Sequence, residues 1–233
     1  MPKVVTGIPK IPAAAVTRYR KLSVATVHEA QGRVGLLSPE IRPIKEGLKL
    51  VGRAVTVFAT PGDNVMIHVA MEQCEPGDVM VVAVNSRSDC GYFGDLLATL
   101  MQARRIAGLV IDSGVRDLAD LRQMNIPVFS RCISAQGTVK ETLGDVNVPV
   151  VCGGQVINPS DLIIGDDDGV VVVRRHELDS VAQKSETREN KEASIREKYR
   201  EGTLGLDMNN MRKRLLDMGL QYITYEEDKE TRD

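Results

Sequence analysis

The chain of 233 residues has few aromatic side chains: only 3% are Phe, Tyr or Trp, and tryptophan is absent. Sites that stack nucleic-acid bases or sugars depend on exposed rings, so this composition argues against both. No block of Lys or Arg stands out, and the formal net charge is −2. Nucleic acid is therefore not expected as a partner, and an anionic ligand would have to be attracted by local groups.

Cysteine motifs and long hydrophobic runs are also missing. The four cysteines show no CxxC spacing, which argues against a disulfide framework or a zinc site and favours reduced thiols. No run reaches the roughly eighteen apolar residues of a membrane helix, and the N-terminus lacks the apolar segment of a signal peptide. These absences predict a cytoplasmic protein without a membrane partner. Serine-hydrolase, P-loop and Rossmann motifs are absent too.

The order of hydrophobic patterns predicts an α/β fold with a parallel sheet. Strands are expected at 51–60, 79–84, 108–111 and 127–130, and helices at 64–74, 96–105 and 118–124. Strands that alternate with helices imply right-handed crossovers between parallel strands. Near the N-terminus, Ser23 is expected to cap a short helix. After Ser134, short strands at 148–152, 161–166 and 169–174 predict a β-rich second layer.

A long helix is expected over 175–201, and it is charged nearly all round. Glu192 and Arg196 stand at the supportive i,i+4 spacing. A helix without an apolar face cannot bury a wide surface in its own domain, so we expect it to pack on a neighbouring subunit; a solvated surface helix is the alternative. The sequence thus predicts a single catalytic domain at 1–174, a helical extension at 175–225 that packs on the neighbour, and a charged, frayed tail at 226–233.

Two turns between residues 91 and 120 predict one functional site. Asp95 follows Gly94 and opens a helical pattern, and Arg116 and Asp117 follow an apolar strand. In an open parallel sheet both turns lie at the carboxyl ends of strands, where ligands bind. A helix N-terminus, a guanidinium and two carboxylates suit an anionic, oxygen-rich substrate beside a hard divalent cation.

Each of these residues also has a structural alternative. For Asp95 the alternative is a helix N-cap, and for Asp117 it is the cap of the helix that starts at Leu118. For Arg116 it is a salt bridge with Asp112 or Asp117. Magnesium sites often use one or two protein carboxylates and several waters, so Asp117 alone is an acceptable ligand.

The remaining polar clusters carry weaker signals. Asp120 stands one helical turn after Asp117 and is either near the site or solvated. The run 166–168 before Gly169 lacks the alternating ligands of a calcium loop, and a tight turn explains it better. The three histidines show no zinc spacing, and His68 within an amphipathic pattern is interpreted as structural.

With these residues the chain resembles the class II pyruvate aldolases, the 4-hydroxy-4-methyl-2-oxoglutarate / 4-carboxy-4-hydroxy-2-oxoadipate aldolases. The resemblance rests on Asp95, twenty intervening residues and then Arg116-Asp117. It extends over VATVHEAQGR, PGDNVMIHVAMEQCEPGDV, GYFGDLL, IDSGVRD, SAQGTVKET, NVPVVCGGQVINPSD and DDDGVVVV. These segments are most similar to the 4-carboxy-4-hydroxy-2-oxoadipate branch. Regulators of ribonuclease E activity share the superfamily but generally lack the long C-terminal helix.

The resemblance implies an αββα sandwich of the swivelling, phosphohistidine-domain-like type, with a projecting C-terminal helix, assembled as trimers or hexamers. It implies magnesium or manganese bound through Asp117 and waters. Arg116 and the loop Gly94-Asp95-Leu96-Leu97 would hold the pyruvyl part of the substrate, with Asn64 nearby. Glu192 corresponds to an acid supplied by the adjacent subunit, so active sites would be shared within the homo-oligomer.

The implied reaction is cleavage of 4-carboxy-4-hydroxy-2-oxoadipate to pyruvate and oxaloacetate, and of 4-hydroxy-4-methyl-2-oxoglutarate to two pyruvates. Cleavage leaves an enolate, whose oxygen the metal and Arg116 would stabilise. A metal-associated water oriented by Asp95 and Glu192 is the expected base. Oxaloacetate decarboxylation, which forms the same enolate, is the expected side activity. The alternative function is a non-catalytic regulator that binds a ribonuclease.

Overall fold

The computed structural model describes residues 1–230 and divides into two compact units, Met1–Thr187 and Arg188–Asp233. The boundary falls inside α6 (Leu178–Arg200), whereas the sequence placed the start of a C-terminal extension at 175. Each unit is described by itself below.

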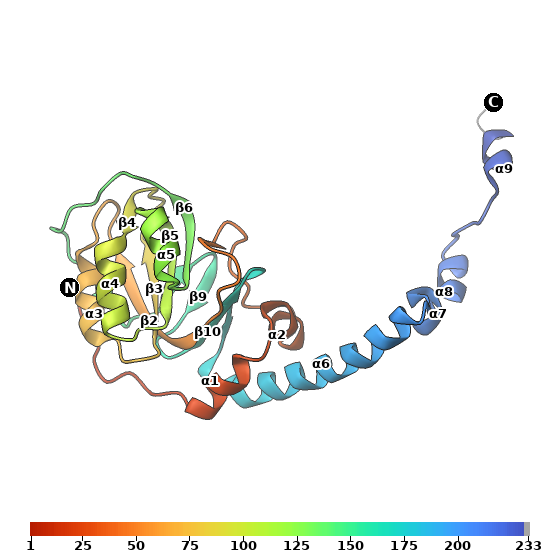
Figure 1. Ribbon diagram of the computed structural model, residues 1–233, viewed down its shortest axis with the longest axis horizontal. Helices are drawn as coiled ribbons and strands as arrows, with labels where there is room; N and C mark the ends of the chain where they lie inside the picture. Colours follow the sequence, from red (N-terminus) through yellow and green to blue (C-terminus); the bar gives the residue numbers. More distant parts are fainter. Residues whose placement is uncertain (231–233) are drawn as a thin grey trace. The chain divides into compact units, whose positions relative to one another are not determined.

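A parallel sheet forms the centre of the first unit (Figure 1). Its strands lie in the order β6 (Val128–Ile133), β5 (Gly108–Val115), β3 (Val79–Val84) and β2 (Leu50–Ala59). Three short strands extend it: β1 (Arg42–Pro43) on β6, β4 (Gly91–Phe93) on β5 and β7 (Asp145–Val146) on β2. The predicted parallel sheet is confirmed, and β4 is a strand that the sequence analysis missed.

Strand β2 belongs to both β layers. Residues 54–59 pair in parallel with β3, and residues 50–53 pair antiparallel with β10 (Leu162–Asp166). Strand β10 continues antiparallel to β11 (Gly169–Val173), and β8 (Val150–Cys152) pairs with β9 (Gln155–Ile157). These strands form the second β layer expected after Ser134.

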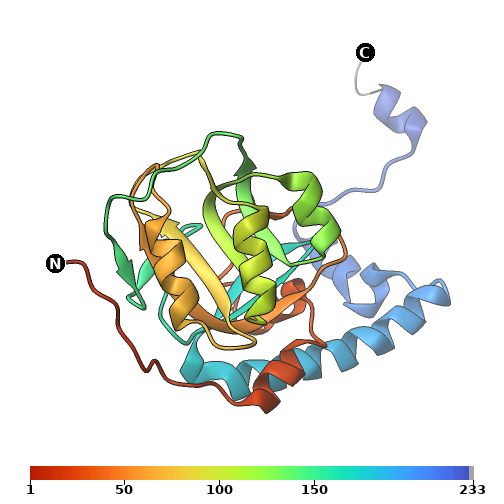
Figure 2. The ribbon, with the colours of Figure 1, turned by 60° about the vertical axis from the view of Figure 1, so that its left-hand side comes forward.

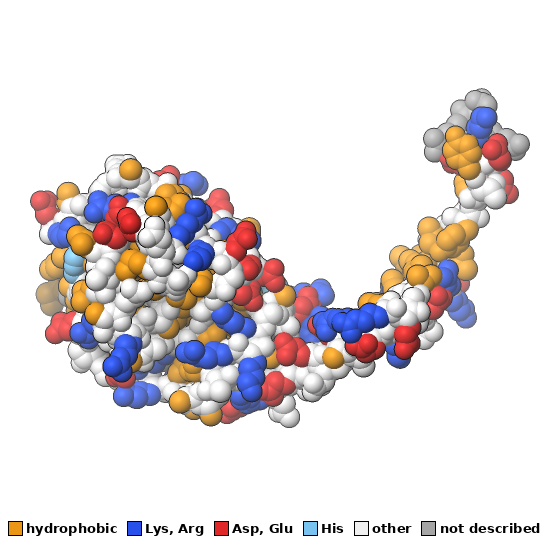
Figure 3. Space-filling model, in the orientation of Figure 1, with side chains coloured by type: hydrophobic (Ala, Val, Ile, Leu, Met, Phe, Trp, Pro, Cys, Tyr) orange, Lys and Arg blue, Asp and Glu red, His pale blue; other side chains and the backbone are white. Residues whose placement is uncertain are grey.

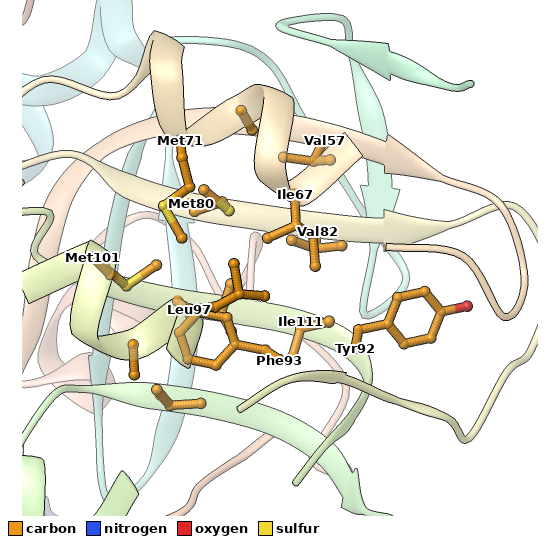
Figure 4. Close-up of a cluster of buried hydrophobic side chains, with 14 of the residues drawn as sticks. Val57, Ile67, Met71, Met80, Val82, Tyr92, Phe93, Leu97, Met101 and Ile111 are labelled. Atoms are coloured by element: carbon orange, nitrogen blue, oxygen red, sulfur yellow. The ribbon is translucent and has the colours of Figure 1, made fainter. Parts of the chain in front are cut away.

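Alternating side chains of the parallel strands separate two cores. Val57, Met80, Val82 and Ile111 face α3 (Val65–Gln73), α4 (Asp95–Ala103) and α5 (Leu118–Met124), as Figure 4 shows for the labelled side chains. Val79, Val81, Val110 and Phe129 face the second β layer, where Cys152, Ile157, Ile163 and Val172 meet them. The sheet is thus buried on both faces.

Helices also cover the outer face of β10 and β11. Helices α1 (Ala13–Tyr19) and α2 (Val24–Ala30) pack there beside the first turns of α6, and Figures 1 and 2 both place α1 next to α6. Ser23 caps α2 by accepting a hydrogen bond from the Thr26 N–H (3.1 Å), as expected. The four layers, helix, sheet, sheet and helix, confirm the predicted αββα sandwich.

The first turns of α6 pack on other helices and strands of the same chain. The sequence analysis expected a helix charged all round and did not predict this contact. After a 3-10 turn (Arg175–Glu177), Leu178, Val181, Ala182 and Ser185 are buried. They repeat at i, i+3, i+4 and i+7, which makes an apolar stripe two turns long. The Tyr19 hydroxyl donates a hydrogen bond to the Leu178 carbonyl (2.8 Å) and strengthens this contact.

The second unit contains the rest of α6, α7 (Gly205–Met208), α8 (Met211–Asp217) and α9 (Tyr225–Glu230). The sequence analysis expected a frayed tail at 226–233, but residues 226–230 belong to helix α9. Residues 231–233 lie outside the described residues. The Glu227 carboxylate accepts the Thr224 N–H (2.6 Å), and the Glu227 N–H donates to the Thr224 hydroxyl (3.3 Å). This reciprocal pair is a capping box, which explains why the segment is helical.

Charge and hydropathy of the described residues agree with the composition. Figure 3 shows positive and negative side chains interspersed over the visible face of the first unit. Among residues 1–230, no helix has the length and apolar character that crossing a bilayer requires.

The acidic run 166–168 forms a turn, in which Asp166 accepts the N–H groups of Val24 (2.8 Å) and Asp168 (3.0 Å), so the turn interpretation is confirmed.

Docking of α6 on its own chain leads to a stability prediction. Val181→Ala removes buried methyl groups, and we expect the free energy of unfolding to fall by about 2 kcal/mol. Gln183→Ala, at an exposed position of the same helix, should change it by less than about 0.5 kcal/mol. Urea denaturation at a fixed protein concentration measures both. Equal effects of the two substitutions would contradict the packing of α6 described above.

Candidate active site

A pocket of about 130 Å³ lies at the carboxyl ends of the parallel strands. The turn after β2, the β4–α4 turn, the β5–α5 turn and the segment before β7 supply its walls. This is the edge at which open α/β sheets bind ligands. The pocket brings together all the site residues that the sequence predicted in the first unit, namely Asn64, Gly94, Asp95, Leu96, Leu97, Arg116 and Asp117.

Asp117 joins the two central turns. Its backbone is left-handed (φ 57°, ψ 41°), a conformation that aspartate tolerates better than most residues. The side chain does not cap α5, which corrects that alternative. Instead, its carboxylate Oδ2 accepts the Asp95 N–H (3.3 Å) and lies 3.5 Å from the Arg116 Nε. These contacts turn the carboxylate toward the neighbouring turn and leave its side chain one third exposed (33%).

Glycines allow the two turns to approach each other. A Cβ atom at Gly94 would lie 2.1 Å from the Asp117 Oδ2, and one at Gly91 would lie 2.4 Å from the Ser134 carbonyl oxygen. Gly94 has an extended backbone (φ −148°), so its requirement is for space and not for an unusual conformation. Any larger residue at 94 would displace the carboxylate.

Of the structural alternatives considered above, the salt bridge of Arg116 with Asp117 is present (3.5 Å), whereas the bridge with Asp112 and the capping role of Asp95 are not. The Arg116 side chain is still 45% exposed, and the Arg116 backbone N–H donates to the Phe93 carbonyl (2.9 Å). Asp112, an alternative partner of Arg116, pairs with Arg131 instead (2.6 Å). Gly94 occupies the N-cap position of α4, so Asp95 is the first helical residue and not the cap. Asp120 is exposed and does not line the pocket.

Asn64 places an unused acceptor beside the pocket. The side chain is only 6% exposed, and its Nδ2 donates to the Tyr92 carbonyl (2.8 Å). Within the described part of the chain, its Oδ1 is buried and has no hydrogen-bond partner. A buried acceptor without a partner is costly, so it indicates a donor or a cation that the protein alone does not provide.

Asp63 fixes the segment 138–142 over the start of α3. One carboxylate oxygen accepts the Val65 N–H (2.9 Å), and the other accepts those of Glu141 (2.7 Å) and Thr142 (2.6 Å). Burial raises the pKa of Asp63, but these backbone N–H donors outweigh it and hold the pKa below its ordinary value. The Asn64 N–H also donates to the Val139 carbonyl (3.1 Å). Thr138 and Lys140 thereby reach the pocket.

His68 and Lys140 line the pocket and were not predicted as site residues. The sequence interpreted His68 as structural, and the structure places its side chain exposed at the pocket. Desolvation, followed by the nearby Lys140 ammonium, lowers the pKa of His68, so the neutral imidazole is favoured. The i,i+4 spacing from Asn64 could have revealed His68. No local signal in the sequence reveals Lys140.

Glu192 lies in the second unit, on α6. Its carboxylate pairs with Arg188 (2.8 Å), one turn earlier, rather than with Arg196 as the spacing suggested. The structure therefore shows Glu192 only within the second unit of this chain.

A larger cavity of about 510 Å³ lies elsewhere in the first unit. Four of its five charged residues are paired: Arg53 binds Asp78 through two nitrogens (2.8 and 2.7 Å), and Lys10 lies 3.0 Å from Glu75, while Arg20 is exposed. Within residues 1–230, this cavity offers no free buried acceptor, whereas the smaller pocket offers the Asn64 Oδ1 beside a guanidinium and two carboxylates.

The donor set of the smaller pocket suits a hard cation. Within residues 1–230, no three His, Cys, Asp or Glu side chains gather as a metal cluster. Asp117 offers a partly exposed carboxylate, and Asn64 offers the unpartnered Oδ1. Magnesium binds through one or two protein carboxylates and keeps several waters, so these oxygens fit such an ion, whereas zinc would favour nitrogen and sulfur ligands.

Comparisons with known proteins agree with this fold. The profile of the family described as "RraA-like: Aldolase/RraA" matches residues 24–172. A protein of Halalkalibacterium halodurans named "Putative 4-hydroxy-4-methyl-2-oxoglutarate aldolase" is 34% identical over 176 residues, which cover 75% of this chain and 83% of that protein.

Two solved structures extend the likeness to the fold. An uncharacterized protein from Pseudomonas syringae pv. tomato is 29% identical with a TM-score of 0.74, over 87% of this chain and 100% of the other. Streptomyces coelicolor RraAS2, described as an unusual member of the RNase ES inhibitor RraA protein family, is 27% identical with a TM-score of 0.73, over 81% of this chain and 100% of the other.

The contact between Gly94 and Asp117 leads to a coupling prediction. Gly94→Ala should lower the free energy of unfolding by up to about 1 kcal/mol, because the new methyl group displaces the partly exposed Asp117 carboxylate from its hydrogen bond with the Asp95 N–H. Asp117→Ala removes the overlapping oxygen, so the double variant should lose less stability than the sum of the single variants. Urea denaturation of all four proteins measures the coupling. Strictly additive losses would show that the two residues do not touch.

Proposed function

We propose that this chain, which belongs to the RraA-like family, is an aldolase that cleaves 4-hydroxy-2-oxo carboxylates. One observation carries the proposal: the exposed Arg116 guanidinium, the Asp117 carboxylate and the start of α4 meet in one pocket. The aldolase name of the Halalkalibacterium halodurans relative supports it.

The chain's own groups account for binding of the pyruvyl half. The first N–H groups of α4, at Leu96 and Leu97, would bind the substrate's C1 carboxylate at the helix N-terminus. The planar fork of Arg116 suits the 2-oxo and carboxylate oxygens, and its charge stabilises the enolate oxygen that develops. The exposed Leu96 side chain lies at the rim, where it contacts substrate and limits the access of water.

Cleavage breaks the C3–C4 bond after the 4-hydroxyl group loses its proton. The electron pair remains with the pyruvyl half as an enolate, and C4 becomes the carbonyl carbon of the second product. Asp95, at the mouth of the pocket, orients the base that takes this proton. The enolate is then protonated at C3 to give pyruvate.

We further propose that magnesium or manganese binds through Asp117, with the Asn64 Oδ1 nearby. When bound, the cation supplies the Lewis acidity that polarises the 2-oxo group. The Asp95 N–H and the Arg116 Nε hold the Asp117 carboxylate in place for it.

The proposed substrates are 4-carboxy-4-hydroxy-2-oxoadipate, which gives pyruvate and oxaloacetate, and 4-hydroxy-4-methyl-2-oxoglutarate, which gives two pyruvates. Loss of carbon dioxide from oxaloacetate forms the same pyruvate enolate and should follow as a side activity. A non-catalytic regulator that binds a ribonuclease is the competing function, because the similar Streptomyces coelicolor RraAS2 belongs to an RNase inhibitor family.

The first functional prediction is that pyruvate release depends on a divalent cation. The purified protein should release pyruvate from both 4-hydroxy-2-oxo acids and from oxaloacetate after magnesium or manganese is added. Exhaustive EDTA treatment should abolish the activity, because the ligands that Asp117 and Asn64 offer are oxygens, which favour such ions. A coupled lactate dehydrogenase assay measures the rate. Full activity of the metal-free protein would exclude the cation, and no activity under any condition would favour the regulator.

We also propose that Glu192 completes the site of an adjacent copy in a homotrimer or homohexamer. Among the site residues that the sequence predicts, it alone lies outside the first unit, on a helix rich in charge. An acid supplied by a neighbour would join Asp95 in orienting the base.

Mixed oligomers provide the test. Glu192→Ala and Asp117→Ala proteins should each be inactive yet folded and assembled. After subunit exchange, confirmed by native mass spectrometry of tagged chains, some activity should return, because an intact Asp117 of one chain can meet an intact Glu192 of another. Mixed oligomers without activity would show that the site is not shared.

A further inference from the structure

The larger cavity of about 510 Å³ lies at the amino ends of the parallel strands, at the opposite edge of the sheet from the candidate active site. The segment 10–20, which includes α1, forms one wall, and the turn 75–78 before β3 forms the other. Its volume lies within the roughly 300–1,000 Å³ of small-molecule sites. The proposed cleavage reaction makes no use of this cavity.

Arg53 holds both walls of the larger cavity in place. Its guanidinium binds the Asp78 carboxylate through two nitrogens, and its Nη1 donates to the Ile8 and Pro9 carbonyls (both 3.3 Å). Asp78 in turn accepts the Glu75 N–H (2.7 Å). The Arg53 side chain is only 7% exposed, so a buried ion pair and backbone contacts preform the cavity, as a binding site requires.

Arg20 supplies the charge that this cavity does not compensate. The other four charged residues of the cavity form two ion pairs with one another. Among residues 1–230, no carboxylate forms an ion pair with Arg20, which is exposed. Arg20 also lines a second hollow of about 390 Å³, in which the other charged residue is the cation Lys49. The surroundings of Arg20 therefore attract an anion.

Apolar side chains line the cavity beside this charge. Ile11 and Val16 are half-buried against the core that α1 shares with α2 and α6, and Ala13 and Pro76 are exposed on the two walls. An apolar wall next to a single guanidinium suits a ligand with the same division, namely an apolar body that ends in one carboxylate. A ligand with several charges would gain little from the apolar wall.

We propose that the larger cavity is a binding site for a small amphipathic monocarboxylate. The Arg20 guanidinium binds the carboxylate through charge-assisted hydrogen bonds, for which its planar fork is suited. The apolar part of the ligand covers Ile11, Val16 and Pro76, so affinity increases with the length of that part. The site is separate from the proposed active site and does not depend on the aldolase function, because the two lie at opposite edges of the sheet.

Calorimetric titration of the full-length protein with octanoate, below its micelle concentration, tests the site. Octanoate should bind saturably, and hexanoate about tenfold more weakly, because a shorter chain buries less apolar surface. Octylammonium, which has the same chain and the opposite charge, should not bind. Arg20→Gln should raise the Kd for octanoate about tenfold, and Arg20→Lys, which keeps the charge, should raise it less. Ala13→Asp places a carboxylate on the cavity wall and should abolish binding, while an acid in the first turn favours α1.

Arg196→Gln is the matched control, since it removes an arginine at an exposed position of α6 that lines neither hollow. It should leave the Kd for octanoate unchanged, and circular dichroism checks that every variant is folded. Equal binding of octylammonium, or an unchanged Kd in Arg20→Gln, would overturn the inference. Octanoate that fails to bind saturably would also overturn it, as when another copy of the chain covers the cavity. Because no substrate is present, none of these outcomes bears on the proposed function.

Discussion

The position of the Asp117 carboxylate depends on the absence of a side chain at residue 94. With glycine there, the Oδ2 occupies the space that a Cβ atom would fill at 2.1 Å, and it accepts the Asp95 N–H. The left-handed backbone of Asp117 carries a cost that persists only where the surroundings hold it. The contact fixes the β4–α4 and β5–α5 turns relative to each other, and with them every group at the centre of the pocket.

Another wall of the pocket is formed by the turn after β2 and the segment before β7. The buried Asp63 carboxylate and the buried Tyr92 ring hold this wall in place. Asp63 ties the segment 141–142 to the start of α3, and the Tyr92 hydroxyl accepts the Gly62 N–H (2.6 Å) and donates to the Thr60 carbonyl (3.1 Å). Tyr92 belongs to β4, so the turn after β2 is joined to the strand that leads into α4. Hydrogen bonds between buried side chains and backbone groups therefore set the shape of the pocket, as preorganised sites require.

Local periodicity in the sequence predicted the parallel strands and the β-rich second layer, and the two turns predicted Asp95, Arg116 and Asp117. The αββα layers and the place of Asn64 and of the loop 94–97 in the site were expected from the family resemblance. Strand β4 was missed because its three residues are too short for a period-2 pattern, and the capping box before α9 was overlooked. The contribution of Lys140 was beyond prediction, because its place depends on pairing with residues 63 and 64, far away in the chain. The apolar stripe at the start of α6 was hidden by the charges around it.

The pocket consists of a fixed floor and an exposed rim. Gly94, Asn64 and Asp117 are held by backbone contacts or by lack of space, so substitutions there disturb neighbouring turns. Leu96, His68 and Lys140 are exposed at the rim, where a different side chain need not move the backbone. One fold can therefore keep its architecture while its site chemistry changes, which fits a family whose members carry the names of both an aldolase and an RNase inhibitor. Fold similarity alone cannot separate these functions, because function depends on site groups, such as those at the rim, that the fold does not require.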